Sequence, residues 1–378
     1  MYGLSKSCFV VLGACLLTSS ALGGGFYDFM PGSGTAVFNI TPDGQVATGV
    51  ADGVVYRWTA ATGAVAISGA DWNNTFTAGL SNDGNTIVSS MVNPASGKQE
   101  GAVWHPGSGW SFIGGFADGG VDDSLSTAYD VSGDGSQVVG LAWHPNYRAE
   151  GFSWTQGGGM VGLGRPAIQS SRASAISRDG STVVGFYESD TQGVRQPVRW
   201  VNGGTPDLFL GESESGEAMK TNSDGSVIVG YNWQDGVGSR AFMYDGTVHY
   251  LGVLPEHESN FDPRSIANAV SDNGIVVGWS GGDPFWGDPE EGFVWTAQDG
   301  MINAHSYLAA HGVTVPGNLL LNTITSISAD GTTFGGQATD LNTFQASSWI
   351  ATVPVPEPAS MAVLGLGALA LLRRRKRA

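Results

Sequence analysis

One pattern of apolar and polar residues occurs seven times along the chain, each time around an Asp-Gly or Asn-Gly pair. The seven stretches are ITPDGQVATG from Ile40, LSNDGNTIVSS from Leu80, VSGDGSQVVG from Val131, ISRDGSTVVG from Ile176, NSDGSVIVG from Asn222, VSDNGIVVG from Val270 and ISADGTTFGG from Ile327. Apolar and polar residues alternate before each pair, as in Ala128 to Ser132, whereas the residues after each pair are mostly apolar. The pattern predicts a hairpin whose second strand is buried on both faces. We expect a type I′ turn, with positive φ at both central residues.

Each repeat also carries an aromatic residue at a similar place. Fourteen to twenty-one residues after the turn glycine the chain has Trp58, Trp104, Trp154, Trp200, Tyr244, Trp295 and Trp349. A fourth element often follows and ends at Ile113-Gly114, Leu163-Gly164, Leu210-Gly211 or Leu251-Gly252. Four short strands in ~45 residues are typical of a propeller blade. The sequence therefore predicts an all-β fold, a seven-bladed β-propeller over residues 26–353. A pair of β-sandwiches, the alternative, would not explain the sevenfold recurrence.

The two ends of the repeat region complement one another. The seventh repeat has no fourth element after Trp349, while an apolar segment, Phe26 to Met30, stands just before the first repeat. We expect this segment to pair with the strand around Ser347 to Ala351, because closing the ring removes two exposed sheet edges. One stretch departs from the repeat. Asn303 to Gly312 predicts a short helix with an Asn cap and a Gly stop, inserted before the last blade.

The N-terminus has the three parts of a secretory signal peptide, predicted over residues 1–21. Lys6 is the positive flank, Cys8 to Leu17 the apolar run, and Ser19-Ser20-Ala21 a small-residue cleavage site. A lipoprotein cleavage box at Leu12-Gly13-Ala14-Cys15 is the alternative. Both cysteines of the chain lie inside this segment, so the mature protein is expected to have no disulfide.

The C-terminus, residues 354–378, joins a proline-rich stretch, an apolar run and a basic cluster. Its parts are Val355-Pro356-Glu357-Pro358-Ala359-Ser360, then Met361 to Leu372, then Arg373-Arg374-Arg375-Lys376-Arg377. As a helix the twelve-residue run would be about 18 Å long at ~1.5 Å per residue, short for a hydrocarbon core of ~30 Å. The basic residues behind it are expected to stay in the cytoplasm while the rest of the chain is outside.

This tail resembles the PEP-CTERM sorting signal of Gram-negative-type bacteria. The resemblance implies a transmembrane helix at 361–372, recognition by an exosortase-type protease, and delivery to the cell surface or extracellular matrix. A plain tail anchor is the alternative. The repeats resemble HAF repeats of bacterial extracellular proteins, through Tyr250-Leu251-Gly252, Ala267 to Gly278 and Gly292-Phe293-Val294-Trp295. The His of the family tripeptide is absent before the tryptophans. That resemblance implies a surface location and a propeller-like fold, but no established activity.

The charge balance excludes one class of partner. Without Lys6 and the five C-terminal basic residues, 11 basic residues face 34 acidic ones. Such a surface repels phosphate backbones, so we expect no nucleic-acid binding.

Acidic residues gather in two of the longer connections and are candidates for calcium ligands. They are Asp118, Asp122 and Asp123 in one connection, and Asp283, Asp288, Glu290 and Glu291 in the other. A solvated acidic surface is the alternative, since neighbouring residues of a strand point to opposite faces. The turn aspartates recur singly, unlike a calcium loop with ligands at alternate positions, and are assigned to turn geometry. The histidines lack metal-binding spacing, so no zinc site is predicted.

Taken together, these features predict an exported, surface- or matrix-associated propeller without enzymatic activity or cofactor. Signal peptidase and an exosortase-type protease are its expected partners. One alternative is a carbohydrate-binding module for extracellular polysaccharide, using aromatic residues beyond the one-per-blade set: Trp110, Trp143, Trp233, Trp279, Phe285 and Trp286. The other is a propeller hydrolase or lyase. Convergent acids with a basic group in a funnel would favour the enzyme, whereas coplanar tryptophans on a flat rim would favour the sugar binder.

Overall fold

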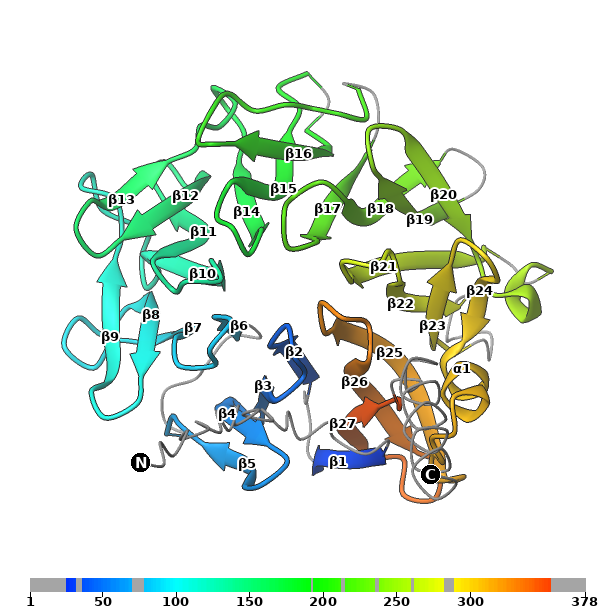
Figure 1. Cartoon of the computed structure of the whole chain (residues 1–378). Helices are drawn as coiled ribbons and strands as arrows, with labels where there is room; N and C mark the ends of the chain where they lie inside the picture. The colour runs from blue at the N-terminus through cyan, green and yellow to red at the C-terminus, as the bar shows by residue number, and fades with distance from the viewer. Residues whose placement is uncertain are drawn as a thin grey trace, which may run out of the picture.

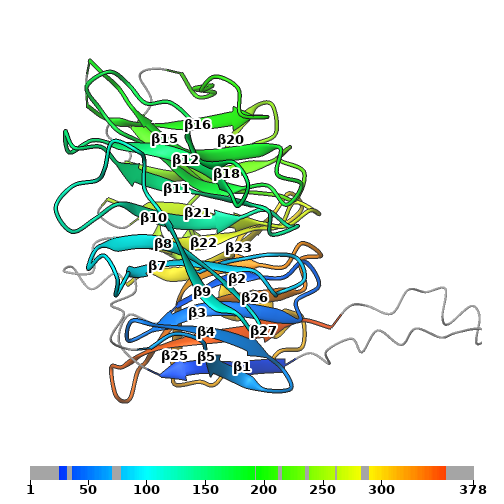
Figure 2. The ribbon, with the colours of Figure 1, turned by 90° about the vertical axis from the view of Figure 1, so that its left-hand side faces the viewer.

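The computed structural model describes residues 25–31, 36–69, 78–191, 193–211, 215–234, 238–259, 262–281 and 289–354. Seven antiparallel sheets stand around a central axis, as the prediction requires (Figure 1). Figure 2 shows the ring from the side. The signal segment, the sorting motif and the apolar run 361–372 lie outside the described residues. None of the helices within the described residues has the length and apolar character that a membrane crossing needs.

The first three blades have four strands each. They are β2 (Ala36–Ile40), β3 (Val46–Ala51), β4 (Val54–Thr59) and β5 (Gly63–Ala66); β6 (Gly79–Leu80), β7 (Ile87–Val92), β8 (Gln99–His105) and β9 (Gly109–Gly114); and β10 (Ser126–Val131), β11 (Gln137–Trp143), β12 (Ala149–Thr155) and β13 (Gly159–Gly162). In each blade the first strand is innermost, and the hairpin at the Asp-Gly pair joins it to the second.

The next blades continue the same order. They are β14 (Ser171–Ile176), β15 (Thr182–Glu188) and β16 (Arg195–Val201); β17 (Ser215–Thr221), β18 (Ile228–Gln234), β19 (Gly238–Tyr244) and β20 (Val248–Gly252); and β21 (Arg264–Val270), β22 (Val276–Gly281), β23 (Glu291–Thr296) and β24 (Gly300–Asn303). A 3-10 helix, η2 (Pro255–His257), precedes β21. The predicted helix is α1 (Ala304–Ala310), whose cap Asn303 accepts a hydrogen bond from the His305 amide.

Two sequence predictions need correction. The fourth blade has three strands, because the stretch before Leu210-Gly211 forms only a single bridge, Arg199 to Asp207. Pro206 stands beside that bridge and has no amide hydrogen to extend the pairing. The Asp-Gly turns are also not type I′, since only the glycine has positive φ. At Gly44, for example, the amide donates to the Thr41 carbonyl at 2.9 Å, and the Thr41 amide donates to the Val46 carbonyl.

The turn carboxylates hold these longer connections together. Asp134 accepts hydrogen bonds from the Ser132 hydroxyl at 2.6 Å and from the Ser136 amide at 3.0 Å. The same pair of bonds recurs at Asp43, Asp83, Asp179 and Asp330. These bonds, the side-chain hydroxyl bond first, lower the pKa of Asp134 below its ordinary value. They agree with the assignment of these aspartates to turn geometry.

The ring closes as predicted from the two ends of the repeat region. The seventh blade consists of β25 (Leu319–Ile327), β26 (Thr333–Asp340), β27 (Ala346–Thr352) and the N-terminal strand β1 (Gly25–Pro31). Phe26 lies opposite Ala351 in the register and stacks on Trp349, with ring centroids 5.8 Å apart. Tyr27 packs edge-on against Trp58 of the first blade. Strand β1 therefore belongs to one blade by hydrogen bonding and to the next by side-chain contact.

Strand direction gives the ring two different ends. Innermost strands run toward the Asp-Gly turns, and the third strand of a blade runs the same way. We call the end with these turns the turn end, and the opposite one the loop end. Gly25 pairs with Thr352, and the Val353 amide donates to the carbonyl of Thr332, so both described termini lie at the turn end.

Candidate functional site: the central channel

A β-bulge interrupts the innermost strand of six blades at the same place in the repeat. The residues left without a partner there are Phe38, Tyr129, Ser174, Met219, Asn268 and Thr325. A bulge re-aims the unpaired side chain. With Ala78, which stands before β6, the six residues line one cavity of about 230 Å³, so each blade contributes one position. We call this cavity the wide compartment.

The lining differs around the ring. Blades one to three contribute Phe38, Ala78 and Tyr129, which form an apolar, aromatic arc. The fourth, sixth and seventh blades contribute two hydroxyls and an amide, and Met219 of the fifth blade lies between them. Arg172 also lines the cavity, near the beginning of its strand, together with Asn39 and Lys220. The cavity therefore lies toward the loop end of the channel.

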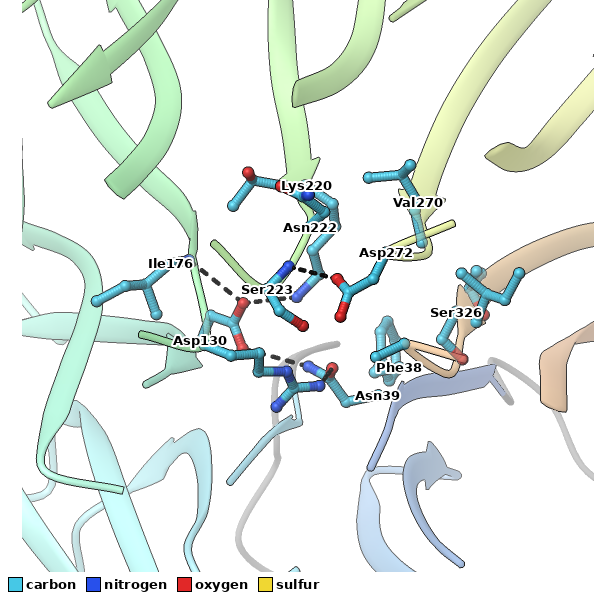
Figure 3. Close-up of a pocket in the computed structure, with 16 residues that line it drawn as sticks. Phe38, Asn39, Asp130, Ile176, Lys220, Asn222, Ser223, Val270, Asp272 and Ser326 are labelled. Carbon is cyan, nitrogen blue, oxygen red and sulfur yellow. Dashed lines mark hydrogen bonds and ion pairs between the residues drawn. The ribbon is translucent and has the colours of Figure 1, made fainter. Parts of the chain in front are cut away.

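An ion pair across the channel forms the floor of the wide compartment, and Figure 3 shows it among the residues that line the narrower cavity below that floor. Lys220 of the fifth blade contacts Asp130 of the third, with Nζ and Oδ2 2.7 Å apart and side chains 21% and 5% exposed. The Asp130 carboxylate also accepts hydrogen bonds from the Asn39 amide at 3.3 Å and from the backbone amides of Val131 and Ile176. Four blades thus meet at one buried carboxylate.

Below this floor the channel narrows toward the turn end. A second cavity of about 50 Å³ is bounded by Asn39 and Lys220 on one side and by Arg178 and Asp272 on the other. At ~30 Å³ per molecule it has room for only one or two waters. Its charged groups are already paired, and Asp272, for example, accepts a hydrogen bond from the Ser223 amide at 2.9 Å.

Arg178 closes the turn end. Its guanidinium donates to the carbonyls of Leu80 and, at 3.0 Å, Ile40, which belong to the second and first blades. Around the rest of the ring the turns are joined by hydrogen bonds, such as those from Asn82 to Gly133 and from Gly133 to Arg178. Pro42 of the first blade has no amide hydrogen to continue this series. The guanidinium of Arg178 spans the channel to that interruption. Burial lowers its pKa, against the opposing effect of Asp130 and Asp272.

A second group of charges lies beside the wide compartment. Glu217 is 2% exposed and forms ion pairs with Arg172 and, at 3.5 Å, with Arg195. The Ser174 hydroxyl donates to the same carboxylate at 2.9 Å. The Arg172 guanidinium also lies over the ring of Tyr129, 5.0 Å from its centroid. This network fixes one aromatic wall of the cavity.

The calcium candidates of the first acidic connection do not converge. Asp118 contacts Nδ1 of His144 at 2.7 Å, while Glu150 contacts Nε2 at 2.9 Å. The two carboxylates lie on opposite sides of one imidazole, which stacks on Phe116. Asp122 accepts a hydrogen bond from the Tyr147 hydroxyl, and the Asp123 carbonyl accepts one from the Gln99 amide. These contacts join neighbouring connections to one another.

The second acidic connection is only partly described, since Asp283 and Asp288 lie outside the described residues. Burial raises the pKa of Glu290, and Glu291 accepts a hydrogen bond from the Asn303 amide at 2.9 Å. Within the described ranges, no three His, Cys, Asp or Glu side chains are grouped so that they could hold a metal ion.

The additional aromatic residues that the structure describes stand on four different blades, in β9, β11, β18 and β22. Trp110 donates to the carbonyl of Ile67 and is partly buried, as are Trp143 and Trp279. Trp233 is 43% exposed. Phe285 and Trp286 lie outside the described residues.

The channel residues were not among the sequence candidates, although the repeat contains a signal for them. The frame Ala-x-x-Val-Ser of Ala128 to Ser132 recurs in related forms, such as Ala218-Met219-Lys220-Thr221-Asn222, and the two positions inside it vary from blade to blade. Variation inside a constant frame marks the side chains that face the axis rather than the core.

Comparisons with solved structures agree with the fold. The β-propeller domain of the Trilobed protease from Pyrococcus furiosus, described as having an open velcro topology, is 12% identical, with a TM-score of 0.54 over 87% of this chain and 96% of that one. Puromycin hydrolase complexed with PGG is also 12% identical, with a TM-score of 0.54 over 82% of this chain and 52% of that one. The chain thus spans about half the length of that hydrolase.

Sequence comparison identifies the tail only. No curated protein sequence matches this chain. One family description matches it, the PEP-CTERM protein-sorting motif, over residues 354–377. These residues are therefore a PEP-CTERM sorting motif, joined to a seven-bladed β-propeller.

Proposed function

We propose that this protein is an exported propeller of the cell surface or extracellular matrix that acts by binding rather than by catalysis. The sorting motif at 354–377 supports export and an exosortase-type partner. The signal-like residues 1–21 and the apolar run 361–372 complete the proposal, with insertion in the membrane before processing. The resemblance of the repeats to HAF-type extracellular repeats agrees with the same location.

The pairing of the channel charges is the observation that favours binding. Acidic and basic side chains do converge in the channel, as a propeller enzyme would require. Each of the two carboxylates, however, already forms ion pairs and hydrogen bonds with other groups of the protein. Asp130 is bound to Lys220 and three other donors, and Glu217 to two arginines and a hydroxyl. A general acid or base must exchange a proton with the ligand within hydrogen-bond reach. Groups already held by cations and amides are better suited to shaping a cavity.

The processing test uses the native host. Intact-mass measurement of surface-released protein should show loss of Met361 to Ala378, and a variant lacking 354–378 should no longer reach the surface fraction. Full-length chains that keep the C-terminal arginines would contradict processing.

The binding test uses the host's own matrix. Purified protein should co-sediment with washed matrix while the size distribution and reducing-end content of that material stay constant. New reducing ends would favour the hydrolase or lyase. A carbohydrate-binding role is the second candidate, favoured by the mixed aromatic and polar lining of the wide compartment.

A further inference from the structure

We infer that the wide compartment binds the terminal unit of a neutral polysaccharide, one sugar ring entering from the loop end. This inference rests on the proposed binding function and names its ligand. Three observations support it: the distribution of the lining residues, the balance of charge, and the closed floor.

The lining suits a sugar ring in shape and chemistry. A pyranose has an apolar face of C–H groups and a rim of hydroxyls. Phe38 and Tyr129 offer apolar surface from one side of the ring of blades. On the other side, Asn268 donates its amide hydrogens to Thr323 and Ile324, which leaves its amide oxygen as an acceptor. The volume, about 230 Å³, is slightly below the ~300–1,000 Å³ of sites for drug-sized ligands. It suits one small ring.

The charge balance favours a neutral ligand. Both cations that line the compartment have a carboxylate partner, Glu217 for Arg172 and Asp130 for Lys220. An anionic ligand would have to approach these buried carboxylates, and a cation would meet the two basic side chains. Burying an unpaired charge in such a site is unfavourable. A uronate-rich chain therefore fits less well than a neutral one.

The floor restricts the ligand to a chain end. Asn39, Asp130 and Lys220 meet across the channel, and Arg178 spans it below them. A polysaccharide cannot pass through such a channel, so an internal unit would have to bend sharply to enter. A terminal unit can enter directly while the rest of the chain remains outside the loop end.

The experiment measures binding of defined sugars by calorimetry and by saturation-transfer NMR. The probes are methyl glycosides of neutral hexoses, their di- to hexasaccharides, two tetrasaccharides capped at the non-reducing or at the reducing end, and a uronic acid tetrasaccharide. We expect affinity to change less than twofold beyond the disaccharide, the strongest NMR signal on one terminal ring, and loss of binding when that same end is capped. Tyr129→Ala, or Met219→Trp to fill the cavity, should weaken binding at least tenfold in protein with an unchanged fold.

The matched control is Trp233→Ala, which removes an exposed aromatic that does not line the compartment. It should bind like the wild type. Loss of binding in this variant, affinity that grows with chain length, or tighter binding of the uronate would overturn the inference. So would absence of neutral-sugar binding at millimolar concentration in protein that still co-sediments with matrix. Failure to co-sediment would instead contradict the proposed function itself.

Discussion

The ion pair at the channel floor gives a quantitative test of how the blades are held together. Asp130→Asn keeps the shape of the side chain and removes its charge, leaving the Lys220 ammonium, 21% exposed, without its partner. Breaking a buried pair from one side costs about 3–5 kcal/mol. Because Lys220 retains some contact with water, we expect the lower value, about 3 kcal/mol. Large domains lose ~2 °C of melting temperature per kcal/mol, so calorimetry should show a fall of about 6 °C.

Two further variants show whether the charge itself is responsible. Asp130→Asn combined with Lys220→Met removes both charges and should regain most of the lost stability, since an apolar replacement of a buried pair is often neutral. Asp207→Asn breaks the more exposed pair with Arg199, whose side chains are 50% and 29% exposed, and should cost at most ~1 kcal/mol. The reasoning is refuted if Asp130→Asn melts within 1 °C of the wild type, or if the double variant is less stable than Asp130→Asn.

Three other predictions concern closure, acid and redox state. Tyr27→Ala should lower stability by about 1–3 kcal/mol and increase hydrogen exchange in β27 and in β4 around Trp58; exchange confined to β1 would contradict a shared blade. The pKa values of Asp134, Asp83 and Asp224 are lower in the folded protein than in the unfolded chain, where an Asp titrates at ~3.9. The stability that these carboxylates contribute is therefore present above that unfolded value and is lost as pH falls through the folded pKa. We expect the melting temperature to fall below about pH 4, and to fall less steeply in Asp134→Asn. The melting temperature of secreted protein should not respond to dithiothreitol, because both cysteines precede residue 22; a shift of several degrees would contradict the signal assignment.

The repeat made the architecture predictable, because the same pattern of turn glycine, apolar strand and aromatic residue recurs in each blade. Trp200 and Trp349 are fully buried in third strands, and Phe26 reaches the place left vacant by the seventh repeat. Local patterns could not reveal contacts across the axis. Asp130 and Lys220 are 90 residues apart, and only closure of the ring brings them together. The turn type was missed for a related reason, since the Asp134 carboxylate bonds to residues on both sides of it and stabilises a longer connection than the dipeptide suggests.

The pairing of Gly25 with Thr352 determines which face of the propeller would turn toward the membrane if the protein were held there by its C-terminal tail. Val353, directly before the sorting motif, lies at the turn end, which is the face that Arg178 closes. A propeller held by its tail, before processing or permanently, would therefore turn its closed face toward the membrane. The wide compartment, which lies toward the loop end, would face the surroundings of the cell. Attachment and access to the cavity then use opposite faces, so neither obstructs the other.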